Sequence, residues 1–401
     1  MAKQNKPAIR FKEFTDAWEQ RKLGEVFEEY SEKNHEELPP LTIIQGGGTI
    51  RRDESERSLQ YDKSSLSNYK MVNKDDFIVH LRSFEGGLEK ANSQGIISPA
   101  YHTFHGENVD SRFYYAYFRS KNFINKDLKP HVYGIRDGRS IDIEGMKTIK
   151  IPYTAYAEQK SIGDFLTALD NLITLHQRKY DKLQVLKKAM LEKMFPKNGS
   201  SVPEIRFEGF TDAWEQRKLS EIADKVTEKN AGLQYIETFT NSAEFGIISQ
   251  RDFFDHDIAK MSSLSGYYIV RNEDFVYNPR ISTSAPVGPI NRNKLGRIGV
   301  MSPLYTVFRP HDVDTTYLEY FFKSKYWHSF MNFNGDSGAR SDRFSIKDSV
   351  FFEMPIPLPY IEEQRKIGEH LTQLDHLITL HQRELEKLQN IKKSMLEKMF
   401  V

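Results

Sequence analysis

Two long stretches of the chain place apolar residues at alternating steps of four and three positions, with one His in each stripe. In the first stretch, the stripe consists of Ile162, Leu166, Leu169, Ile173, His176, Tyr180 and Leu183. In the second, it consists of Ile367, Leu371, Leu374, Ile378, His381, Leu385 and Leu388. A stripe that keeps this period over several heptads is typical of a coiled-coil seam. Gly163 and Gly368 interrupt only the first turns, so each stretch predicts one helix of about 38 residues, roughly 57 Å long.

The two predicted helices are close copies of each other. Leu172–Arg178 recurs as Leu377–Arg383, and Met190–Phe195 recurs as Met395–Phe400, both 205 positions later. Neither helix can bury its stripe alone, so we expect the two to pack on each other; a duplicated dimerisation helix is the alternative. We assign to the helix seam and to partner binding Leu169, Leu172, Ile173, Leu183, Leu374, Leu377, Ile378 and Leu388.

The sequence before each long helix is also repeated. Pro7–Val26 returns as Pro203–Ile222, and both copies predict an extended lead-in, a Thr or Asp cap and a brief helix carrying Trp18 or Trp214. Shorter matches continue along the chain. The repeat predicts residues 1–152 as a first domain, 153–197 as the first long helix, 198–202 as a linker, 203–357 as a second domain and 358–401 as the second long helix.

The two domains mix short strand and helix patterns. Phe77–His80 and Phe275–Asn278 predict strands that enter polar turns, whereas Phe113–Arg119 has aromatic residues at helical spacing. We predict an α+β fold with two mixed α/β domains, separated by a pair of long antiparallel coiled-coil helices, and an internal pseudo-two-fold repeat. Such a pair would hold one domain at each end. That arrangement suits duplex DNA, whose dyad relates two half-sites.

Composition narrows the function only slightly. The 57 basic and 56 acidic residues leave a net charge of +1, so a basic DNA-binding surface would have to be local. The absence of cysteine excludes disulfides and thiolate metal sites and fits a reducing compartment. The first residues carry no apolar run, and no 18 consecutive residues are apolar. We therefore expect neither a signal peptide nor a membrane span, and a cytoplasmic protein.

The combination of repeated motifs resembles the specificity subunits of type I restriction-modification enzymes. The motifs that carry the resemblance are Trp18–Leu23 and Trp214–Leu219, Ile151-Pro152 and Ile356-Pro357, Glu158-Gln159 and Glu363-Gln364, and the two Leu-Ile-Thr-Leu-His-Gln-Arg segments. The resemblance covers the whole chain. It implies that two target-recognition domains each bind half of a bipartite site in double-stranded DNA and that the helices dock two modification (methyltransferase) subunits. Restriction subunits (ATP-dependent translocase and nuclease) would join this core. Adenine N6 methylation with S-adenosylmethionine, and cleavage driven by ATP with Mg, would belong to those partners, so the chain itself would bind no cofactor and catalyse nothing.

The sequence lacks the motifs that such chemistry would need. It has no Gly-x4-Gly-Lys-Ser/Thr phosphate loop, and Asn278-Pro279-Arg280 only approaches the Asn/Asp-Pro-Pro-aromatic motif of adenine methyltransferases. Gly46–Gly48 is predicted to be a flexible turn near DNA rather than a cofactor loop, and the histidines show no metal-ligand spacing. Two other hypotheses remain: an adaptor whose domains bind proteins, and a stand-alone nuclease or methyltransferase.

Candidate DNA-reading residues are polar or basic side chains on turns. Arg suits guanine, Asn and Gln suit adenine, and positions aligned between the domains but different in identity suit sequence reading. His80 aligns with Asn278, and Arg52 aligns with Gln250. The full set of candidates is Arg51, Arg52, His80, Arg82, Ser83, Arg136, Arg139, Gln250, Arg251, Asn278, Arg280, Ser282, Thr283, Arg292, Lys294, Arg340 and Arg343.

Overall fold

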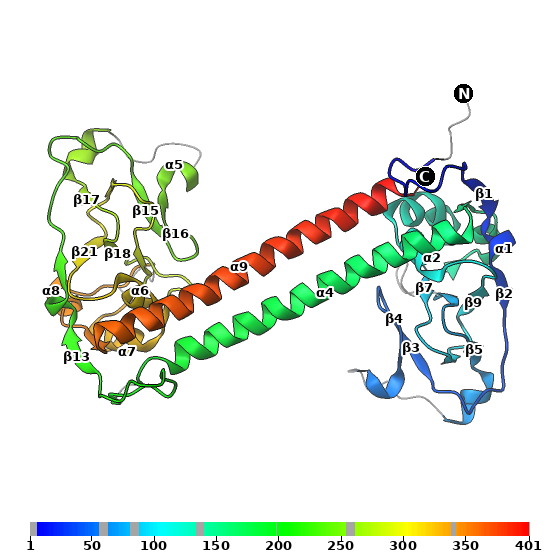
Figure 1. Ribbon diagram of the computed structural model, residues 1–401, viewed down its shortest axis with the longest axis horizontal. Coiled ribbons are helices and arrows are strands. Elements are labelled where there is room, and N and C mark those ends of the chain that lie inside the picture. Colours follow the sequence, from blue (N-terminus) through cyan, green and yellow to red (C-terminus); the bar gives the residue numbers. More distant parts are fainter. Residues whose placement is uncertain are drawn as a thin grey trace. The chain divides into compact units, whose positions relative to one another are not determined.

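The chain forms two compact units, each of which contains part of both long helices. The computed structural model describes residues 6–55, 63–80, 88–133, 140–197, 199–253, 261–337 and 342–400. Unit 1 comprises Met1–Arg178 and Gln382–Val401, and unit 2 comprises Lys179–His381. The long helices are α4 (Tyr156–Lys193) and α9 (Ile361–Lys398), each of 38 residues as the stripes predict (Figure 1).

Unit 1 combines short strands with short helices. Its strands are β1 (Glu19–Lys22), β2 (Glu28–Tyr30), β3 (Leu41–Ile44), β4 (Gly48–Arg51), β5 (Lys70–Val72), β6 (Phe77–Val79), β7 (Glu89–Lys90), β8 (Gly95–Ile97), β9 (His102–His105), β10 (Val132–Tyr133), β11 (Ser140–Ile141) and β12 (Lys150–Tyr153). Its helices before α4 are α1 (Leu23–Val26), η1 (Arg52–Glu54), η2 (Lys63–Asn68), α2 (Ser111–Phe118), η4 (Phe123–Leu128), η5 (Lys129–His131) and α3 (Ile143–Lys147).

Unit 2 follows the same order. Its strands are β13 (Glu215–Lys218), β14 (Ala223–Lys225), β15 (Phe239–Ser242), β16 (Gly246–Ser249), β17 (Tyr268–Val270), β18 (Phe275–Tyr277), β19 (Ile290–Arg292), β20 (Gly299–Met301), β21 (Thr306–Pro310) and β22 (Pro355–Leu358). Its helices before α9 are η7 (Leu219–Glu221), α5 (Gln250–Phe253), η8 (Met261–Gly266), α6 (Thr315–Lys323), α7 (Tyr326–Asn334) and α8 (Asp348–Phe351).

Each unit is built on a four-stranded antiparallel sheet with both faces covered. The strand order is β2-β9-β6-β7 in unit 1 and β14-β21-β18-β19 in unit 2. In β6, Phe77 and Val79 belong to the large aromatic core, whereas Ile78 belongs to a smaller core under the β3–β4 hairpin. Because successive side chains of a strand point to opposite faces, a strand covered on both sides is an uninterrupted apolar run. This explains the Phe-Ile-Val pattern in the sequence.

The end of the second long helix completes the core of unit 1. Met399 is buried, and the ring of Phe400 contacts those of Trp18 and Phe113. Six residues before the end of α9, Lys392 donates to Asp170 of α4 at 2.5 Å. Trp18 in turn donates to Glu158, in the first turn of α4, so the two helix segments of unit 1 run antiparallel.

Unit 2 repeats this construction with the other helix end. Phe195, just after α4, contacts Trp214 and Tyr317, and the Tyr317 hydroxyl donates to the carbonyl of Pro357 just before α9. Lys187 of α4 forms an ion pair with Asp375 of α9. The segments of α4 and α9 within unit 2 are therefore also antiparallel.

The Glu-Gln motif at the start of each long helix fastens that helix to its unit. Glu158 accepts hydrogen bonds from Arg10, at 2.5 and 2.7 Å, and from Trp18. Gln159 accepts from the backbone of Asp110, which caps α2. Gly163 lets α4 approach this cap, because a Cβ there would lie 2.6 Å from Asp110 Oδ1. In unit 2, Glu363 and Gln364 make the corresponding bonds to Arg206 and Asp314.

Two sequence-based expectations need correction. Trp18 and Trp214 do not lie on helices: both precede strands, because the following Glu-Gln-Arg-Lys segments pair with the Ile-Pro strands β12 and β22. Leu172 and Leu377 lie outside the helix seam, with 43% and 40% of their surfaces exposed. They fall one position before the seam residues of the stripe and so face away from it. The other assigned seam residues are buried or half-buried, namely Leu169, Ile173, Leu183, Leu374, Ile378 and Leu388.

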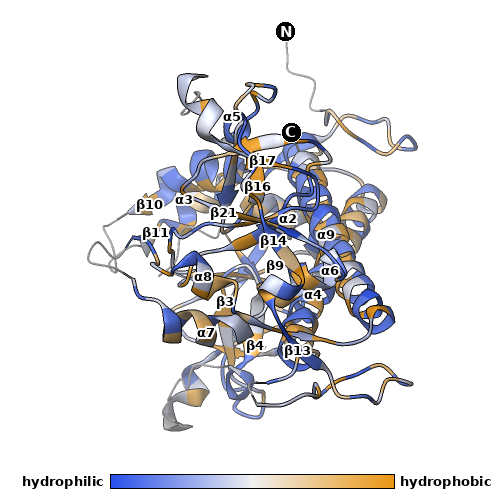
Figure 2. Cartoon of the chain, turned by 90° about the vertical axis from the view of Figure 1, so that its left-hand side faces the viewer, coloured by the Kyte–Doolittle hydropathy of each residue, from blue (hydrophilic) through white to orange (hydrophobic). Residues whose placement is uncertain are grey.

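Both long helices are amphipathic rather than uniformly apolar. Figure 2 shows hydrophilic and hydrophobic residues interspersed along α4 and α9. Among the helices in the described parts of the chain, none has the length and apolar content that a membrane span requires.

Candidate nucleic-acid interface

One pair of candidate residues that align between the two repeats directly follows a central strand of the four-stranded sheet in each unit. His80 comes after β6 and Asn278 comes after β18, so the repeated frame carries an imidazole in one unit and an amide in the other. Burial lowers the pKa of His80, although Glu89 acts in the opposite direction. A neutral imidazole has one donor and one acceptor nitrogen. The Asn278 side chain donates to the carbonyl of Asn241 at 2.8 Å and accepts from the backbone N–H of Arg280 at 2.9 Å.

A second matched pair lies at the base of a hairpin in each unit. Arg52 follows β4 and Gln250 follows β16, and each backbone N–H donates to the carbonyl of the residue just before the hairpin's first strand, Pro40 or Thr238. The Arg52 side chain donates to Leu41 O and to the Tyr69 hydroxyl, both at 3.3 Å. The neighbouring candidates Arg51 and Arg251 are exposed, and Arg51 pairs with Asp53 at 2.9 Å.

Two candidates that are distant in the sequence lie together in unit 2. Arg280 and Arg343 form an isolated antiparallel β-bridge, and both are exposed. The bridge is extended by a hydrogen bond from Ile281 N to Asp342 O. Ser282 and Thr283 continue the exposed turn after Arg280. This turn is therefore the part of unit 2 in which the most predicted residues are gathered and open to solvent.

Arg292 and Lys294 point instead toward a buried carboxylate. Glu319 on α6 is 6% exposed and lies 2.6 Å from Arg292 Nη2 and 2.7 Å from Lys294 Nζ. Arg292 also bonds Glu273 and the hydroxyl of Thr315. Its contacts hold β19 on α6. Lys294 remains half exposed, whereas the guanidinium of Arg292 is largely enclosed.

Five of the candidate residues lie outside the described parts of the chain. They are Arg82, Ser83, Arg136, Arg139 and Arg340.

The Gly46–Gly48 turn holds a carboxylate of its own chain. The backbone N–H groups of Gly46 and Gly48 donate to the two oxygens of Glu89, at 2.8 and 3.2 Å. Glu89 is fully buried and also accepts from Tyr115 and Arg119. Since an anion already occupies these donors, the turn is a structural element rather than a phosphate cradle.

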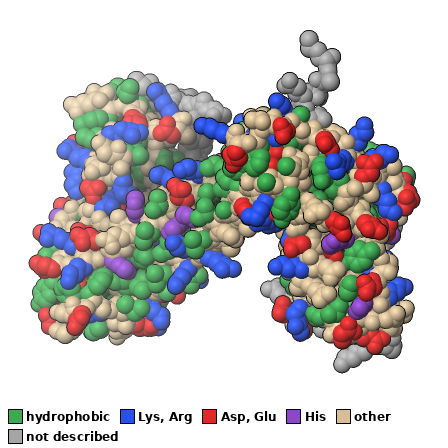
Figure 3. Space-filling model, turned by 45° about the vertical axis from the view of Figure 1, so that its right-hand side comes forward, with side chains coloured by type: hydrophobic (Ala, Val, Ile, Leu, Met, Phe, Trp, Pro, Cys, Tyr) green, Lys and Arg blue, Asp and Glu red, His purple; other side chains and the backbone are tan. Residues whose placement is uncertain are grey.

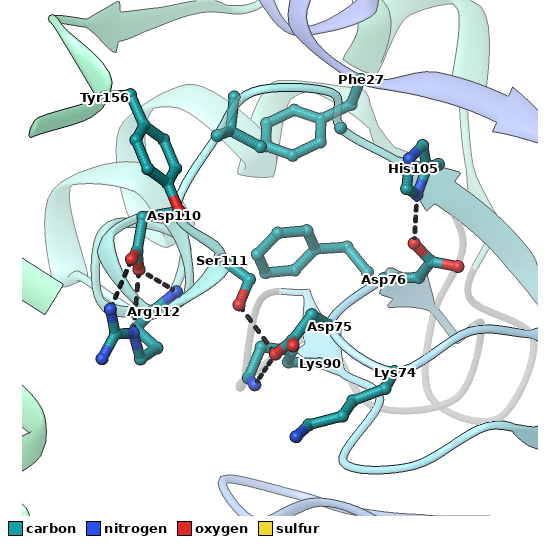
Figure 4. Close-up of a pocket in the computed structure, with 13 residues that line it drawn as sticks. Phe27, Lys74, Asp75, Asp76, Lys90, His105, Asp110, Ser111, Arg112 and Tyr156 are labelled. Atoms are coloured by element: carbon teal, nitrogen blue, oxygen red, sulfur yellow. Dashed lines mark hydrogen bonds and ion pairs between the residues drawn. The ribbon is translucent and has the colours of Figure 1, made fainter. Parts of the chain in front are cut away.

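Unit 1 contains a polar cavity of about 450 Å³ beside β6, β9 and α2 (Figure 4). Asp75 bonds Lys90 at 2.5 Å and the Ser111 hydroxyl at 2.9 Å, whereas His105 contacts Asp76 at 2.6 Å. The hydroxyl and the imidazole thus engage different carboxylates and do not form a nucleophile-base pair.

The same ion pairs recur in unit 2 with larger cations. Arg309 bonds Asp274 at 2.8 Å, and Arg292 bonds Glu273 at 3.1 Å, in the places of His105 with Asp76 and Lys90 with Asp75. Because the pairing is kept while the residue types change, the cluster in Figure 4 fastens the turn before the central strand.

Asparagines that the sequence analysis missed support the Asn278 turn. Asn241 is 1% exposed and donates to the carbonyls of Val276 and Pro289. Asn291 donates to the Asn241 side chain at 2.7 Å. Asn241 thus holds the Asn278 side chain through its carbonyl, and Asn291 in turn holds the Asn241 side chain. Both lie within strands, Asn241 in β15 and Asn291 in β19, and no sequence motif marks them.

Charges are mixed over the surface. On the face shown in Figure 3, basic and acidic side chains are interspersed among the described residues of both units. Among the described residues, no group of three or more His, Asp or Glu side chains is placed to hold a metal ion. The structure thus offers local polar turns rather than one continuous basic tract on that face.

The observations define a duplicated α+β protein in which two related units share long helices. The chain belongs to the type I restriction modification DNA specificity domain family, whose model matches residues 15–185 and 211–390. This confirms the family resemblance and the predicted fold class with its internal repeat.

Relatives of the same kind match most of the chain. It is 25% identical over 347 residues to the MjaVIII specificity subunit of a type I restriction enzyme of Methanocaldococcus jannaschii, covering 81% of this chain and 78% of that protein. It is 24% identical over 422 residues to the putative MjaX specificity subunit of the same organism, covering 96% and 93%. The fold is similar to that of a type I restriction-modification S subunit from M. genitalium, with a TM-score of 0.57, 14% identity and 99% coverage of both chains.

Proposed function

We propose that this chain recognises DNA as the specificity subunit of a type I restriction-modification complex. Each unit binds one half of a bipartite site in double-stranded DNA. The chain docks two modification subunits through its long helices and catalyses nothing itself. Restriction subunits join the assembled core.

The observation that carries this proposal is that the two units share the same backbone arrangement but place different polar side chains at equivalent positions. His80 and Asn278 follow equivalent strands, and Arg52 and Gln250 follow equivalent hairpins. A shared frame presents these groups in the same way to two half-sites, and their differing donor and acceptor patterns select different bases. Arg280 and Arg343 provide the exposed cations beside one of these positions.

The docking of two modification subunits is supported by two pairs of exposed leucines. Leu172 and Leu175 are 43% and 46% exposed on the unit 1 part of α4. Leu377 and Leu380, their counterparts on the unit 2 part of α9, are 40% and 45% exposed. Leucines three positions apart on a helix form a continuous apolar patch, and exposed apolar patches mark interaction sites. An identical patch in each unit fits a partner that binds twice.

Because the partner subunits carry out the chemistry, this chain itself binds no cofactor. Transfer of a methyl group from S-adenosylmethionine to adenine N6 belongs to the modification subunits. Cleavage with ATP and Mg belongs to the restriction subunits. The turn that could have held a phosphate is occupied by Glu89, which is consistent with this division.

Mapping of methylated adenines tests the proposal. Genomic DNA from a host that carries the gene should contain a bipartite methylated motif that disappears when this gene alone is deleted. The adaptor hypothesis predicts an unchanged methylation pattern and no sequence-selective retention of duplex DNA with the partners present. A stand-alone methyltransferase would transfer methyl groups from S-adenosylmethionine to DNA without partners, which we expect not to occur.

A further inference from the structure

The segment Thr15–Lys22 is repeated without change as Thr211–Lys218, although most of it lies on the surface. Only Trp18 and Trp214 are buried within these segments. In both copies, the Thr, Asp, Ala, Glu and Lys side chains are exposed. Exposed side chains contribute little to stability, since surface substitutions usually change it by less than about 0.5 kcal/mol. The fold alone therefore does not explain why both copies keep the same exposed residues.

The second half of each segment forms the outer strand of a two-stranded ribbon. β1 pairs with β12, and β13 pairs with β22. Within the described residues, neither β1 nor β13 has a strand on its other side. Each strand carries the same side-chain pair on one face, Glu19 with Arg21 at 2.8 Å and Glu215 with Arg217 at 3.0 Å.

The two inner strands differ from each other at some positions, whereas the two outer strands have the same sequence. Lys150 and Tyr153 of β12 correspond to Pro355 and Leu358 of β22 in the pairing register. The residues that both inner strands share, Ile151-Pro152 and Ile356-Pro357, are buried, so the shared exposed residues of each ribbon lie on the outer strand and the turn before it, where a partner could reach them.

Each ribbon borders a cavity in the same place. The cavity in unit 1 has a volume of about 350 Å³ and is lined by Arg10, Asp16, Ala17, Glu19 and Glu158 among others. The cavity in unit 2 has a volume of about 210 Å³ and is lined by their counterparts Arg206, Asp212, Ala213 and Glu215. Two equivalent surface cavities with equivalent linings again indicate one kind of occupant.

The charges of the cavities favour a cationic occupant. In unit 1, Glu158 neutralises Arg10 at 2.5 Å and Arg21 pairs with Glu19 at 2.8 Å, and the lining also includes the exposed carboxylates of Glu13 and Asp16. In unit 2, Glu363 neutralises Arg206 at 2.7 Å and Arg217 pairs with Glu215 at 3.0 Å, and the lining also includes the exposed carboxylates of Asp212 and Asp312. These carboxylates would repel DNA phosphates and attract a Lys or Arg side chain.

We propose that the two Thr-Asp-Ala-Trp-Glu-Gln-Arg-Lys ribbons are a pair of docking sites for a protein that binds once to each unit. A Lys or Arg of this protein enters the acidic cavity beside each ribbon, and a neighbouring stretch of it lies along β1 or β13. The inference rests on the proposed function only for the partner's identity, the modification subunit. This contact is separate from the one at the exposed leucines.

Charge reversal in full-length protein tests the proposal. Asp16→Arg should remove docking at unit 1 only, so that the chain binds one modification subunit in place of two when the masses of the complexes are measured by native mass spectrometry. Asp212→Arg should do the same at unit 2. The double variant should bind the modification subunit at least about tenfold more weakly, because a cation now faces the incoming cation. Thermal unfolding of each variant should match that of the unchanged protein.

Matched variants separate docking from general effects. Glu28→Arg with Asp224→Arg makes the same charge change at exposed positions of β2 and β14, and it should leave two subunits bound. Ala17→Tyr with Ala213→Tyr blocks the same sites by bulk without a charge change and should weaken binding like the charge reversal. Full binding of two subunits by both double variants of the ribbon would overturn the proposal, and so would a loss of DNA binding with subunit binding intact. If the unchanged chain binds no modification subunit, the proposed function itself fails.

Discussion

The ring of Phe400 meets the indole of Trp18 at a centroid distance of 6.4 Å with the ring planes at 66°. Phe195 and Trp214 repeat this contact at 6.4 Å and 87°. The sequence Met-Leu-Glu-Lys-Met-Phe ends both long helices. The aromatic residue after α4 therefore completes the core of unit 2, and the one after α9 completes the core of unit 1, so each unit depends on a helix that begins in the other half of the sequence.

Truncating either aromatic side chain should destabilise the unit that receives it. Phe195→Ala removes a side chain that is 1% exposed, and we expect unit 2 to lose about 3–5 kcal/mol of unfolding free energy. Phe400→Ala should cost unit 1 less, because Phe400 is only half-buried. Amide hydrogen exchange resolves the two units. Faster exchange confined to unit 1 in the Phe195→Ala variant would contradict the assignment. Phe333→Ala, at a position 89% exposed, serves as the control with little expected effect.

The buried carboxylate of Glu319 should make unit 2 sensitive to acid. Burial opposes its ionisation, but the charge of Lys323, hydrogen bonds from Lys294 and Lys323, and the charge of Arg292 outweigh burial and lower the pKa to about 2 from 4.5. A lowered pKa favours the folded state fully above about pH 4.5, and this contribution is lost as the pH falls toward 2. Glu319→Gln should therefore cost on the order of 2 kcal/mol at pH 7 and flatten the pH dependence in that window.

Urea unfolding of both proteins at pH 7, 4 and 3 measures this effect. The difference in unfolding free energy between the unchanged protein and Glu319→Gln should shrink steadily as the pH falls. A difference that stays constant from pH 7 to pH 3 would show that the pKa of Glu319 is the same in the folded and unfolded states. Glu353→Gln, which removes an exposed partner of Lys218, should change stability by less than about 1 kcal/mol.

The exposed helix leucines should be required for assembly but not for folding. Leu172→Asp with Leu377→Asp places charges in the apolar patches, where a docked partner would have to bury them, so copurification of the modification subunits should be lost. Because both leucines are more than a third exposed, the melting temperature should change little. Val185→Asp, at a position 70% exposed on α4, is the control and should retain the partners. Intact complex from the double variant would refute the docking surface.

The sequence predicts the long helices and the repeat because these depend on patterns within short stretches. A stripe with a period near 3.5 residues specifies a helix wherever it continues, and α4 and α9 have the predicted length. The same pattern also explains the error at Leu172 and Leu377. Both leucines adjoin seam residues in the sequence, but a helix turns about 100° per residue, so adjacent residues face different directions.

Features that depend on distant pairing could not be predicted in the same way. The polar segment Glu19–Lys22 becomes a strand only because Lys150–Tyr153 pairs with it, and nothing within the segment indicates this partner. Arg292 is similar: its pairing opposite Phe275 in β19 and β18, together with Glu319 on α6, fixes the direction of its side chain. The sequence therefore indicated that Arg292 could contact DNA, whereas in the structure its side chain is bonded to Glu319 on α6.

The turn around Arg280 gives the sharpest test of DNA reading. Arg280 is exposed, its backbone is bridged to Arg343, and its backbone N–H is held by Asn278 at 2.9 Å, so the guanidinium is presented from a fixed turn. Once methylation mapping has given the target, Arg280→Ala should weaken binding of that duplex by roughly 1–3 kcal/mol if the side chain reads a base. Affinities must be compared at one salt concentration, because phosphate contacts depend steeply on salt.

Arg280→Lys distinguishes the two roles that the exposed guanidinium could serve. A base contact with two parallel hydrogen bonds needs the planar guanidinium, so Lys should lose most of the affinity and relax the preference at one base pair. A phosphate contact needs only the charge, so Lys should bind nearly as well as Arg, and the salt dependence should stay the same. Arg297→Ala removes an exposed arginine that pairs with Glu237 at 2.8 Å and should leave binding unchanged. Equal affinity of the unchanged protein and Arg280→Ala would remove this turn from the DNA-binding surface.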